Sequence, residues 1–301
     1  MVNNRKNIFV NILNYFINSV VVVLCILIIR VLFQIFLFSS FHIPSDSMEP
    51  ELIKGDVVVV WKPMIGARLF DLNTSLNLKP VDIYRLPGIR AVRHNDVLVF
   101  NCPYPNNREK LELHVLKYYI KRCVGLPGDT LTIVDGIIKV NAHKQITTNI
   151  SHKVKIMNAL PHIVAQREFQ SFPHDSIIGW TTMNFAPLYI PKAGKCITMN
   201  QMNFIIYRKL IEWEQKGGLQ YRDSIVYLNG KQIDTYCFSK NYYFMVGDKR
   251  GNSLDSRNWG LLPEEYIVGK AAFVWKTIDP YTGNVQWDRC LLYTSPSPRD
   301  S

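Results

Sequence analysis

The sequence predicts a mainly β protein, with one transmembrane helix at the amino terminus followed by an antiparallel β-sheet domain that contains an inserted smaller subdomain. An uncharged apolar segment near the start predicts the helix. Short β-rich runs separated by glycine and proline turns predict the sheet. At 301 residues, of which 48% are hydrophobic, the chain is long enough to bury a sizeable core.

The membrane segment lies close to the amino terminus. Tyr15–Phe41 are mostly apolar and Val20–Ile29 carry no charge, which is too hydrophobic and too long for a surface helix of a soluble protein. We therefore expect a membrane anchor over residues 15–40. A cleaved secretory signal is the alternative, but no small-residue cleavage site follows the apolar stretch promptly.

The flanking charges predict the direction of this anchor. Arg5 and Lys6 precede the span, and basic residues are enriched on the cytoplasmic side of membranes. We expect residues 1–14 to be cytoplasmic and the rest of a single-pass inner-membrane protein to be extracytoplasmic, or periplasmic. The formal net charge of +11 is spread along the chain, which suits a surface beside membrane lipid better than nucleic acid.

The β-rich runs after the anchor define the expected core. They are Asp56–Trp61, Asp96–Phe100, Tyr118–Val124, Thr130–Val134, Ile137–Val140 and Tyr242–Val246. We expect the core in two parts, residues 41–140 and 231–289. Two strands that enter Asn-led turns, ending at Asn141 and Gly230, bracket an expected insertion of residues 141–230 with helical patterning near Met202–Gln215.

Two further features concern the chain end and the cysteines. Residues 290–301 shift abruptly to small polar residues and proline, and we interpret them as a non-native tail. The six cysteines show no C-x-x-C spacing and no obvious disulfide framework, so scattered buried thiols are expected. We expect neither a metal nor a cofactor.

Three segments place reactive side chains among turn-forming residues. The first is Ile43-Pro-Ser-Asp-Ser-Met-Glu-Pro50, in which Ser45 and Ser47 would project the same way if the chain is locally extended. One serine could then attack while the other donates a hydrogen bond to a developing oxyanion. Taken alone, this segment reads better as an ordinary turn.

The second segment is Tyr118-Tyr-Ile-Lys-Arg-Cys-Val-Gly-Leu-Pro-Gly-Asp129. Strand alternation places Lys121 and Arg122 on opposite faces, so only one of them could face solvent. Burial lowers the pKa of a lysine, which turns its amine into a usable base. The alternative is an edge strand with ordinary surface lysine and arginine side chains.

The third segment is Gly247-Asp-Lys-Arg-Gly-Asn-Ser-Leu-Asp-Ser-Arg257, whose glycine, asparagine and serine content predicts a tight loop. Charged pairs could hold this loop rigid, drawn from Asp248, Arg250, Asp255 and Arg257. Ser253 could hydrogen-bond a lysine amine and orient it. Calcium binding is the alternative, but the acidic spacing does not fit and the arginines oppose a cation.

Together these segments resemble bacterial type I signal peptidases, or leader peptidases, a family of Ser/Lys-dyad serine endopeptidases. The family hallmarks are a serine motif after a membrane anchor, a lysine strand ending in G-x-P-G-D, and a G-D-x-R-x-N-S-x-D-S-R loop. All three occur here in the expected order. The match covers Phe41–Lys62, Asp96–Val140 and Asn241–Val274.

The resemblance implies removal of signal peptides from exported preproteins at the outer face of the cytoplasmic membrane, near the secretion translocon. Ser47 would be the nucleophile and Lys121 the general base. The Ser47 backbone N–H and the Ser45 hydroxyl would form the oxyanion hole. Ser253 would orient the lysine, supported by Asp248, Arg250, Asp255 and Arg257.

The resemblance also implies that an extended substrate adds beside the catalytic strands, with shallow pockets for small residues at the first and third positions before the cut. The pocket residues would be Ile43, Met48, Leu52, Tyr119 and Ile120. The chain departs from the family pattern at several places: Asp46 replaces the usual glycine, His94-Asn95-Asp96 replaces Arg-Gly-Asp, and Lys249 and Gly251 replace frequent Asn and Asp.

Two other functions are compatible with these motifs. A self-cleaving Ser/Lys protease of the repressor type shares the catalytic pair, but such proteins are soluble and carry a DNA-binding module. A catalytically inactive, membrane-tethered homologue could bind signal peptides without cutting them. The anchor opposes the first function, and only a measurement of activity separates the second.

Overall fold

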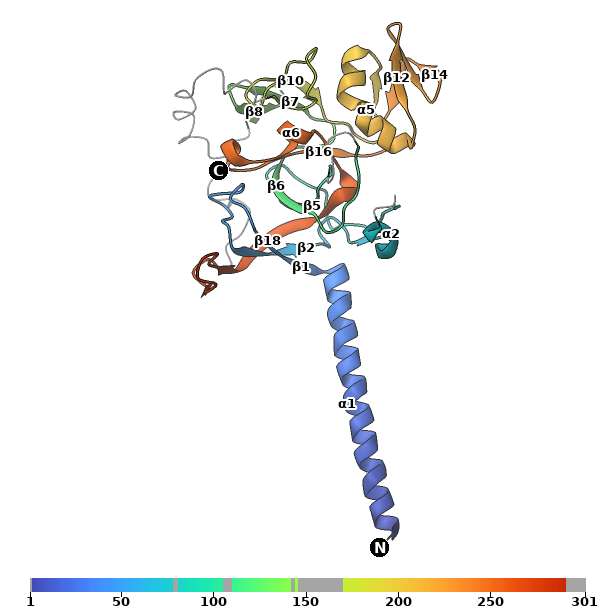
Figure 1. The fold of residues 1–301 in the computed structure, drawn as a ribbon, viewed down its shortest axis with the longest axis vertical. Helices are drawn as coiled ribbons and strands as arrows, with labels where there is room; N and C mark the ends of the chain where they lie inside the picture. Colours follow the sequence, from blue (N-terminus) through green and yellow to red (C-terminus); the bar gives the residue numbers. More distant parts are fainter. Residues whose placement is uncertain (1, 78–80, 105–109, 142–143, 146–169, 291–301) are drawn as a thin grey trace.

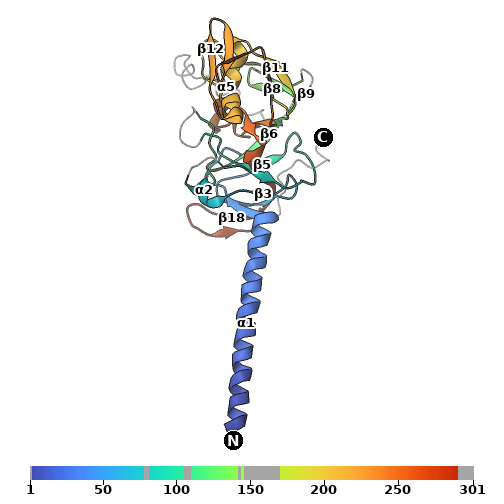
Figure 2. The same cartoon turned by 90° about the vertical axis from the view of Figure 1, so that its right-hand side faces the viewer.

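The computed structural model describes residues 2–77, 81–104, 110–141, 144–145 and 170–290. A long first helix, α1 (Val2–Phe36), stands away from a β-rich body (Figure 1). Figures 1 and 2 both place the main sheet of that body between α1 and a second lobe farther from the helix. The expected class, a mainly β protein behind an N-terminal apolar helix, is confirmed.

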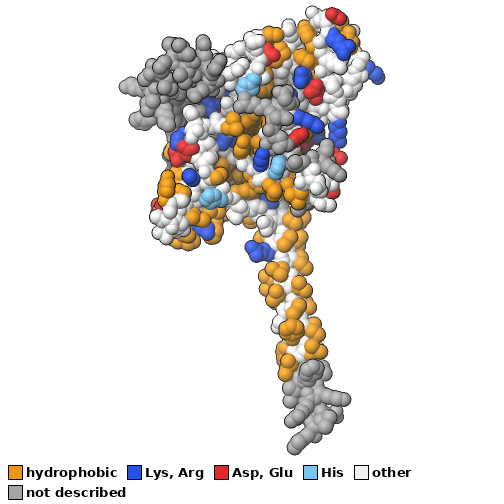
Figure 3. All heavy atoms as spheres, in the orientation of Figure 1, with side chains coloured by type: hydrophobic (Ala, Val, Ile, Leu, Met, Phe, Trp, Pro, Cys, Tyr) orange, Lys and Arg blue, Asp and Glu red, His pale blue; other side chains and the backbone are white. Residues whose placement is uncertain are grey.

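Within the described residues, α1 is the one helix that is long and apolar enough to cross a membrane, over Asn11–Phe36. At 1.5 Å per residue these 26 residues extend about 39 Å, which exceeds the ~30 Å hydrocarbon core of a bilayer. Large apolar side chains are exposed along this part of α1 (Figure 3). A helix that is apolar and exposed all round suits contact with lipid.

The end of α1 is tied directly to the main sheet. Only Leu37 separates α1 from β1 (Phe38–His42), and the Lys62 backbone N–H donates to Leu37 O at 2.9 Å. The Lys62 ammonium donates to Gln34 O at 2.6 Å and to Ile35 O at 3.3 Å. The last carbonyls of a helix lack partners within it, so Lys62 caps α1 and places a cation at the negative end of its dipole.

The main sheet has eight strands in the order β1-β2-β18-β5-β6-β16-β17, with β19 paired to β18, and every neighbouring pair is antiparallel. Its strands after β1 are β2 (Asp56–Trp61), β5 (Val97–Asn101), β6 (Tyr118–Gly125), β16 (Tyr242–Val246), β17 (Leu262–Pro263), β18 (Ile267–Ile278) and β19 (Val285–Gln286). The connections contain β3 (Arg68–Leu69), β4 (Tyr84–Arg85), α2 (Leu72–Leu76), η1 (Arg250–Asn252), α6 (Ser256–Trp259) and η2 (Glu264–Tyr266).

Both faces of the main sheet are buried. On β5, Val97 and Val99 belong to one apolar cluster, whereas Leu98 and Phe100 belong to another. Successive side chains of a strand point to opposite faces, so the two clusters cover the two faces of the sheet. A polar side chain in the middle of β6, the strand beside β5, is therefore removed from water on either face.

The second lobe comprises β7 to β15 together with α5. Its sheets have the strand orders β10-β7-β8-β9, β11-β15 and β12-β13-β14. The bounds are β7 (Thr130–Val134), β8 (Ile137–Val140), β9 (Lys144–Gln145), β10 (Phe185–Tyr189), β11 (Cys196–Thr198), α5 (Gln201–Gln215), β12 (Leu219–Arg222), β13 (Ile225–Leu228), β14 (Lys231–Ile233) and β15 (Thr235–Cys237).

All six expected β-rich runs form strands, and the helical pattern near Met202–Gln215 forms α5. Asn200 caps this helix, accepting a hydrogen bond from the Asn203 backbone N–H at 2.9 Å. β7 and β8 precede residue 141 and pair with each other, and β7 also pairs with β10. One sheet therefore joins chain from both sides of the expected start of the insertion. The domain boundaries stay predictions.

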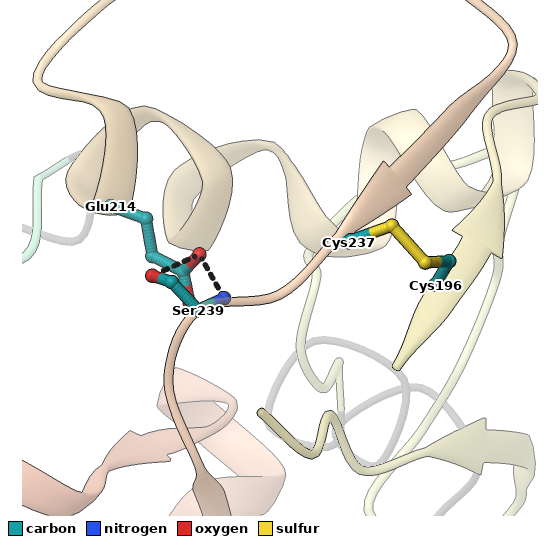
Figure 4. Close-up of a disulfide and its surroundings, with 4 residues drawn as sticks. All are labelled: Cys196, Glu214, Cys237 and Ser239. Atoms are coloured by element: carbon teal, nitrogen blue, oxygen red, sulfur yellow. Dashed lines mark hydrogen bonds between the residues drawn. A yellow bond between two sulfur atoms is a disulfide. The ribbon is translucent and has the colours of Figure 1, made fainter. Parts of the chain in front are cut away.

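A disulfide links Cys196 of β11 to Cys237 of β15 (Figure 4). The expectation of scattered thiols is wrong for this pair, because the two residues meet only through strand pairing across 41 residues of sequence. Cys102 and Cys123 are buried free thiols, as expected. Beside the disulfide, the Glu214 carboxylate of α5 accepts hydrogen bonds from the backbone N–H and the hydroxyl of Ser239 at 2.9 and 3.0 Å.

We expect the double variant Cys196→Ser/Cys237→Ser to lower the free energy of unfolding by about 2–4 kcal/mol, because the disulfide restricts a long loop in the unfolded chain. Urea unfolding in detergent, followed by tryptophan fluorescence, measures this change. Cys290→Ser, which removes a free thiol outside the pair, is the matched control. Equal unfolding midpoints for the double variant and the wild type would contradict the prediction.

Candidate active site

The turn that carries Ser47 follows β1 and is fixed from both ends. Ile43 N–H donates to Asp56 O at 2.8 Å, and Leu52 N–H donates to Met48 O at 3.0 Å. Met48 and Leu52 are fully buried in the apolar cluster on one face of the main sheet. These buried side chains anchor the turn, and Ser47 itself is only 6% exposed.

Lys121 reaches Ser47 from the middle of β6. It pairs with Leu98 of β5 in the sheet, and its Nζ donates to Ser47 Oγ at 2.6 Å. Lys121 is 5% exposed. Removal from water lowers the pKa of Lys121 from 10.5 to about 8, although the nearby carboxylates of Asp255 and Asp248 oppose the shift. The Ser47 hydroxyl is therefore bound to an amine, Lys121, of which a fraction is uncharged near pH 7.

Ser45 lies beside the same hydroxyl. Its Oγ is 3.3 Å from Ser47 Oγ, and its side chain is exposed. The three groups thus follow one another as an exposed hydroxyl, a buried hydroxyl and a buried amine. A substrate carbonyl placed against Ser47 Oγ would have the Ser45 hydroxyl within reach as a second donor.

Arg122 is buried as well as Lys121, which corrects the expectation that one of the two would face solvent. Arg122 Nε and Nη2 donate to the two Asp248 carboxylate oxygens at 2.7 and 2.6 Å, and Nη1 donates to Asn95 O at 3.0 Å. Burial lowers the pKa of Arg122, but the bonds from Asp248 outweigh it and the net shift is upward. The loop after β16 covers this face of β6, and alternation alone did not reveal that cover.

Asp255 and Arg257 form a second buried pair where the loop after β16 enters α6. Arg257 Nε and Nη2 donate to Asp255 Oδ1 and Oδ2 at 2.9 and 2.8 Å, and the Gly247 N–H donates to Asp255 Oδ2 at 3.0 Å. Burial raises the pKa of Asp255, but Arg257 more than offsets this and the net shift is downward. The pair holds the start of the loop against the start of α6.

Ser253 lies close to the dyad without a standard hydrogen bond to it. Its Oγ is buried, and its hydroxyl is one of the groups that lower the pKa of the Asp255 carboxyl. A Cβ on Gly247 would lie 2.1 Å from Ser253 Oγ and 2.7 Å from Ser47 O, so both atoms crowd the space that the glycine leaves. The expected bond from Ser253 to Lys121 is not among the described contacts. The side chain of Arg250, another expected support residue, lies outside the described residues.

The five expected pocket residues divide between the two faces of β6. Ile43, Met48, Leu52 and Ile120 share one apolar cluster. Tyr119 packs against the cluster on the other face, and its ring centroid lies 5.7 Å from Lys121 Nζ. The first four residues therefore lie together on one face of β6, whereas Tyr119 lies on the other face, near Lys121.

Sequence reasoning missed contacts that join the serine turn to the loop after β16. Asp46 and Lys249 were read only as departures from a family pattern, but their charged groups form an ion pair. Glu49 joins the same ammonium at 2.7 Å. Opposite charges within two motifs that were both expected at one site are the signal that could have predicted this pair. Within the described residues, no group of three His, Cys, Asp or Glu side chains could hold a metal.

A family model described as "Signal peptidase, peptidase S26" matches residues 14–276. The chain belongs to this family. Similar relatives include the signal peptidases I of Buchnera aphidicola subsp. Baizongia pistaciae, 29% identical over 88% of this chain and 79% of the relative, and of Pseudomonas aeruginosa, 29% identical over 86% and 72%. Signal peptidase I of Rickettsia massiliae is 26% identical over 85% and 77%. As a member of the S26 peptidases, the chain is a serine endopeptidase, and thus a hydrolase.

The lowered pKa of Lys121 predicts a pH-dependent stability difference in this S26 peptidase. Between pH 8 and 10.5 the unfolded chain holds a proton that the folded chain has lost, so stability rises with pH in that window. Below pH 8 Lys121 is protonated in the folded state, and its buried charge lowers the free energy of unfolding by about 3 kcal/mol. Lys121→Met removes this destabilisation. The stability of the variant minus that of the wild type should therefore fall by about 3 kcal/mol from pH 7 to pH 11, measured by urea unfolding. A constant difference would contradict the shift.

Proposed function

We propose that this chain is a membrane-anchored endopeptidase that removes amino-terminal signal peptides from exported preproteins, with Ser47 as nucleophile and Lys121 as general base. Membership in the S26 family supports signal-peptide removal. The observation that carries the assignment of residues is the buried contact of 2.6 Å between Lys121 Nζ and Ser47 Oγ.

In the proposed reaction, neutral Lys121 accepts the Ser47 proton as Oγ attacks the scissile carbonyl. The tetrahedral oxyanion is stabilised by the Ser47 backbone N–H and the Ser45 hydroxyl. The Lys121 ammonium then donates its proton to the leaving amine, and a water activated by the same lysine hydrolyses the acyl-enzyme. This cycle requires no histidine, because the desolvated lysine already has a pKa in the useful range.

The loop after β16 is proposed to keep the lysine in place. The buried pairs Arg122–Asp248 and Asp255–Arg257 support a rigid loop behind the dyad. Ser253 would orient the Lys121 amine once the lysine releases its bond to Ser47 during the reaction. The position of the buried Ser253 hydroxyl, which lies against Gly247 together with Ser47 O, supports this role.

The proposed substrate binds as an extended peptide with small residues at the first and third positions before the cut. Ile43, Met48, Leu52 and Ile120 would form the apolar floor of these subsites, with Tyr119 on the lysine side. Met48 and Leu52 in this floor are fully buried, so little space remains for a long side chain. Their burial supports shallow subsites.

We further propose that the amino terminus is cytoplasmic and that the catalytic domain works at the outer face of the inner membrane, close to the secretion translocon. The apolar helix α1 supports the anchor. The Cys196–Cys237 disulfide supports an extracytoplasmic domain, because disulfides persist mainly in oxidising compartments.

The dyad predicts the effect of single substitutions on cleavage. Detergent-solubilised wild type should cut a preprotein after an Ala-x-Ala site, and Ser47→Ala and Lys121→Ala should each lower kcat by at least about 1,000-fold. Mass spectrometry of the products locates the cut. Lys139→Ala, which changes an exposed lysine of β8, is the control and should cleave at the wild-type rate. A folded wild type that leaves the preprotein intact would refute the proposal and favour a signal-peptide-binding protein.

The proposal also predicts a pH profile. Because Lys121 must be neutral to accept a proton, kcat/KM should rise tenfold per pH unit at low pH and level off above about pH 8. Initial rates on a short peptide substrate between pH 5.5 and 10 measure this limb. A profile that stays flat down to pH 6 would show that another group acts as the base.

A further inference from the structure

A group of charged and polar side chains joins the turn that carries Ser47 to the loop after β16. The Lys249 ammonium contacts the Asp46 carboxylate and donates to Glu49 Oε2 at 2.7 Å. Asn252 Nδ2 donates to Asp46 Oδ1 at 2.8 Å. We name these four residues, Asp46, Glu49, Lys249 and Asn252, the acid–lysine clamp. The Lys249 backbone N–H also donates to Ser47 O at 3.0 Å, so one residue holds the turn by main chain and side chain together.

The clamp completes a bridge between the two halves of the dyad. Lys121 is followed by Arg122, which binds Asp248 through two hydrogen bonds. Asp248 is followed by Lys249, which binds the residue directly before Ser47. Each end of the bridge thus lies one residue from a member of the dyad. The separation between β6 and the serine turn is fixed by ion pairs as well as by the apolar cluster beneath.

We propose that Asp46 and Lys249 are positioning residues, which hold Ser47 Oγ against Lys121 Nζ without touching the substrate. This inference rests on the proposed function, since it assigns the clamp a role in the same reaction. A displacement of about 1 Å at a reacting group can lower a rate about 100-fold. The clamp holds Asp46 and Glu49, which flank Ser47 in the turn. Without these contacts the turn can shift and carry Ser47 Oγ away from Lys121 Nζ.

Two observations indicate that the clamp places Ser47, and that it neither contributes much to the stability of the fold nor sets the pKa of Lys121. The clamp is partly exposed, with side-chain exposures of 31% for Asp46 and 22% for Lys249, and exposed ion pairs contribute little to the free energy of unfolding. The bond from Lys249 lowers the pKa of Asp46, and the bonds from Asp46 and Glu49 raise the pKa of Lys249. Both groups therefore stay charged while Lys121 titrates, and the clamp leaves the pH profile in place.

The test compares Lys249→Met, Asp46→Ala and the combined variant with the wild type on a short peptide substrate. We expect Lys249→Met to lower kcat about 10- to 100-fold, with KM and the midpoint of the acid limb unchanged. Lys249→Arg should retain most of kcat, because it keeps the charge and the backbone bond. The combined variant should lose less activity than the product of the two single losses, since both substitutions break the shared contact between Lys249 and Asp46.

The matched control is Lys216→Met, which breaks an exposed ion pair with Asp82 remote from the serine turn, and wild-type kcat is expected for it. Thermal unfolding of each variant shows that it is folded at the assay temperature. Wild-type kcat in Lys249→Met, additive losses in the combined variant, or a shifted acid limb would each overturn the positioning role. An inactive wild type would instead refute the proposed function, so the two failures are distinguishable.

Discussion

A lysine side chain placed in the middle of a β-sheet loses its hydration, and the surroundings of Lys121 are organised by that constraint. Its strand lies between β5 and β16, and apolar clusters cover both faces of the sheet. The resulting desolvation brings the pKa of Lys121 to about 8. The buried amine of Lys121 also contacts Ser47 Oγ, so an amine and a hydroxyl meet where water is largely excluded.

The charges nearest to Lys121 are arranged so that they do not cancel this effect. Asp248 and Asp255 both favour the protonated lysine, but each carboxylate is bound through two oxygens to an arginine. Arg257 in turn disfavours the protonated form. Two carboxylates can therefore stiffen the loop behind Lys121 while burial, with a smaller contribution from Arg257, keeps the net shift of the Lys121 pKa downward.

The sequence predicts the local parts of this site well. Strand alternation separates Lys121 from Arg122, and the resemblance to type I signal peptidases implies that Lys121, Ser47 and the loop after β16 share one site. The structure brings these three parts together. A local sequence pattern does not show which residues far apart in the chain contact each other. The burial of Arg122 depends on Asp248, and the disulfide depends on the pairing of β11 with β15. Likewise, Asp46 contacts Lys249, which lies 203 positions later in the chain.

The junction between α1 and the main sheet has a consequence for how the enzyme sits at a bilayer. One residue separates the helix from β1, and Lys62 binds the last carbonyls of α1 from the end of β2. With one residue between them and Lys62 bound to the end of α1, a change in the direction of the helix is expected to carry the sheet with it. Transmembrane helices tilt to match the thickness of the surrounding lipid. In the proposed membrane-bound state, a change of tilt would be passed to the sheet, so that membrane thickness would set the height and the angle at which Ser47 faces its substrate.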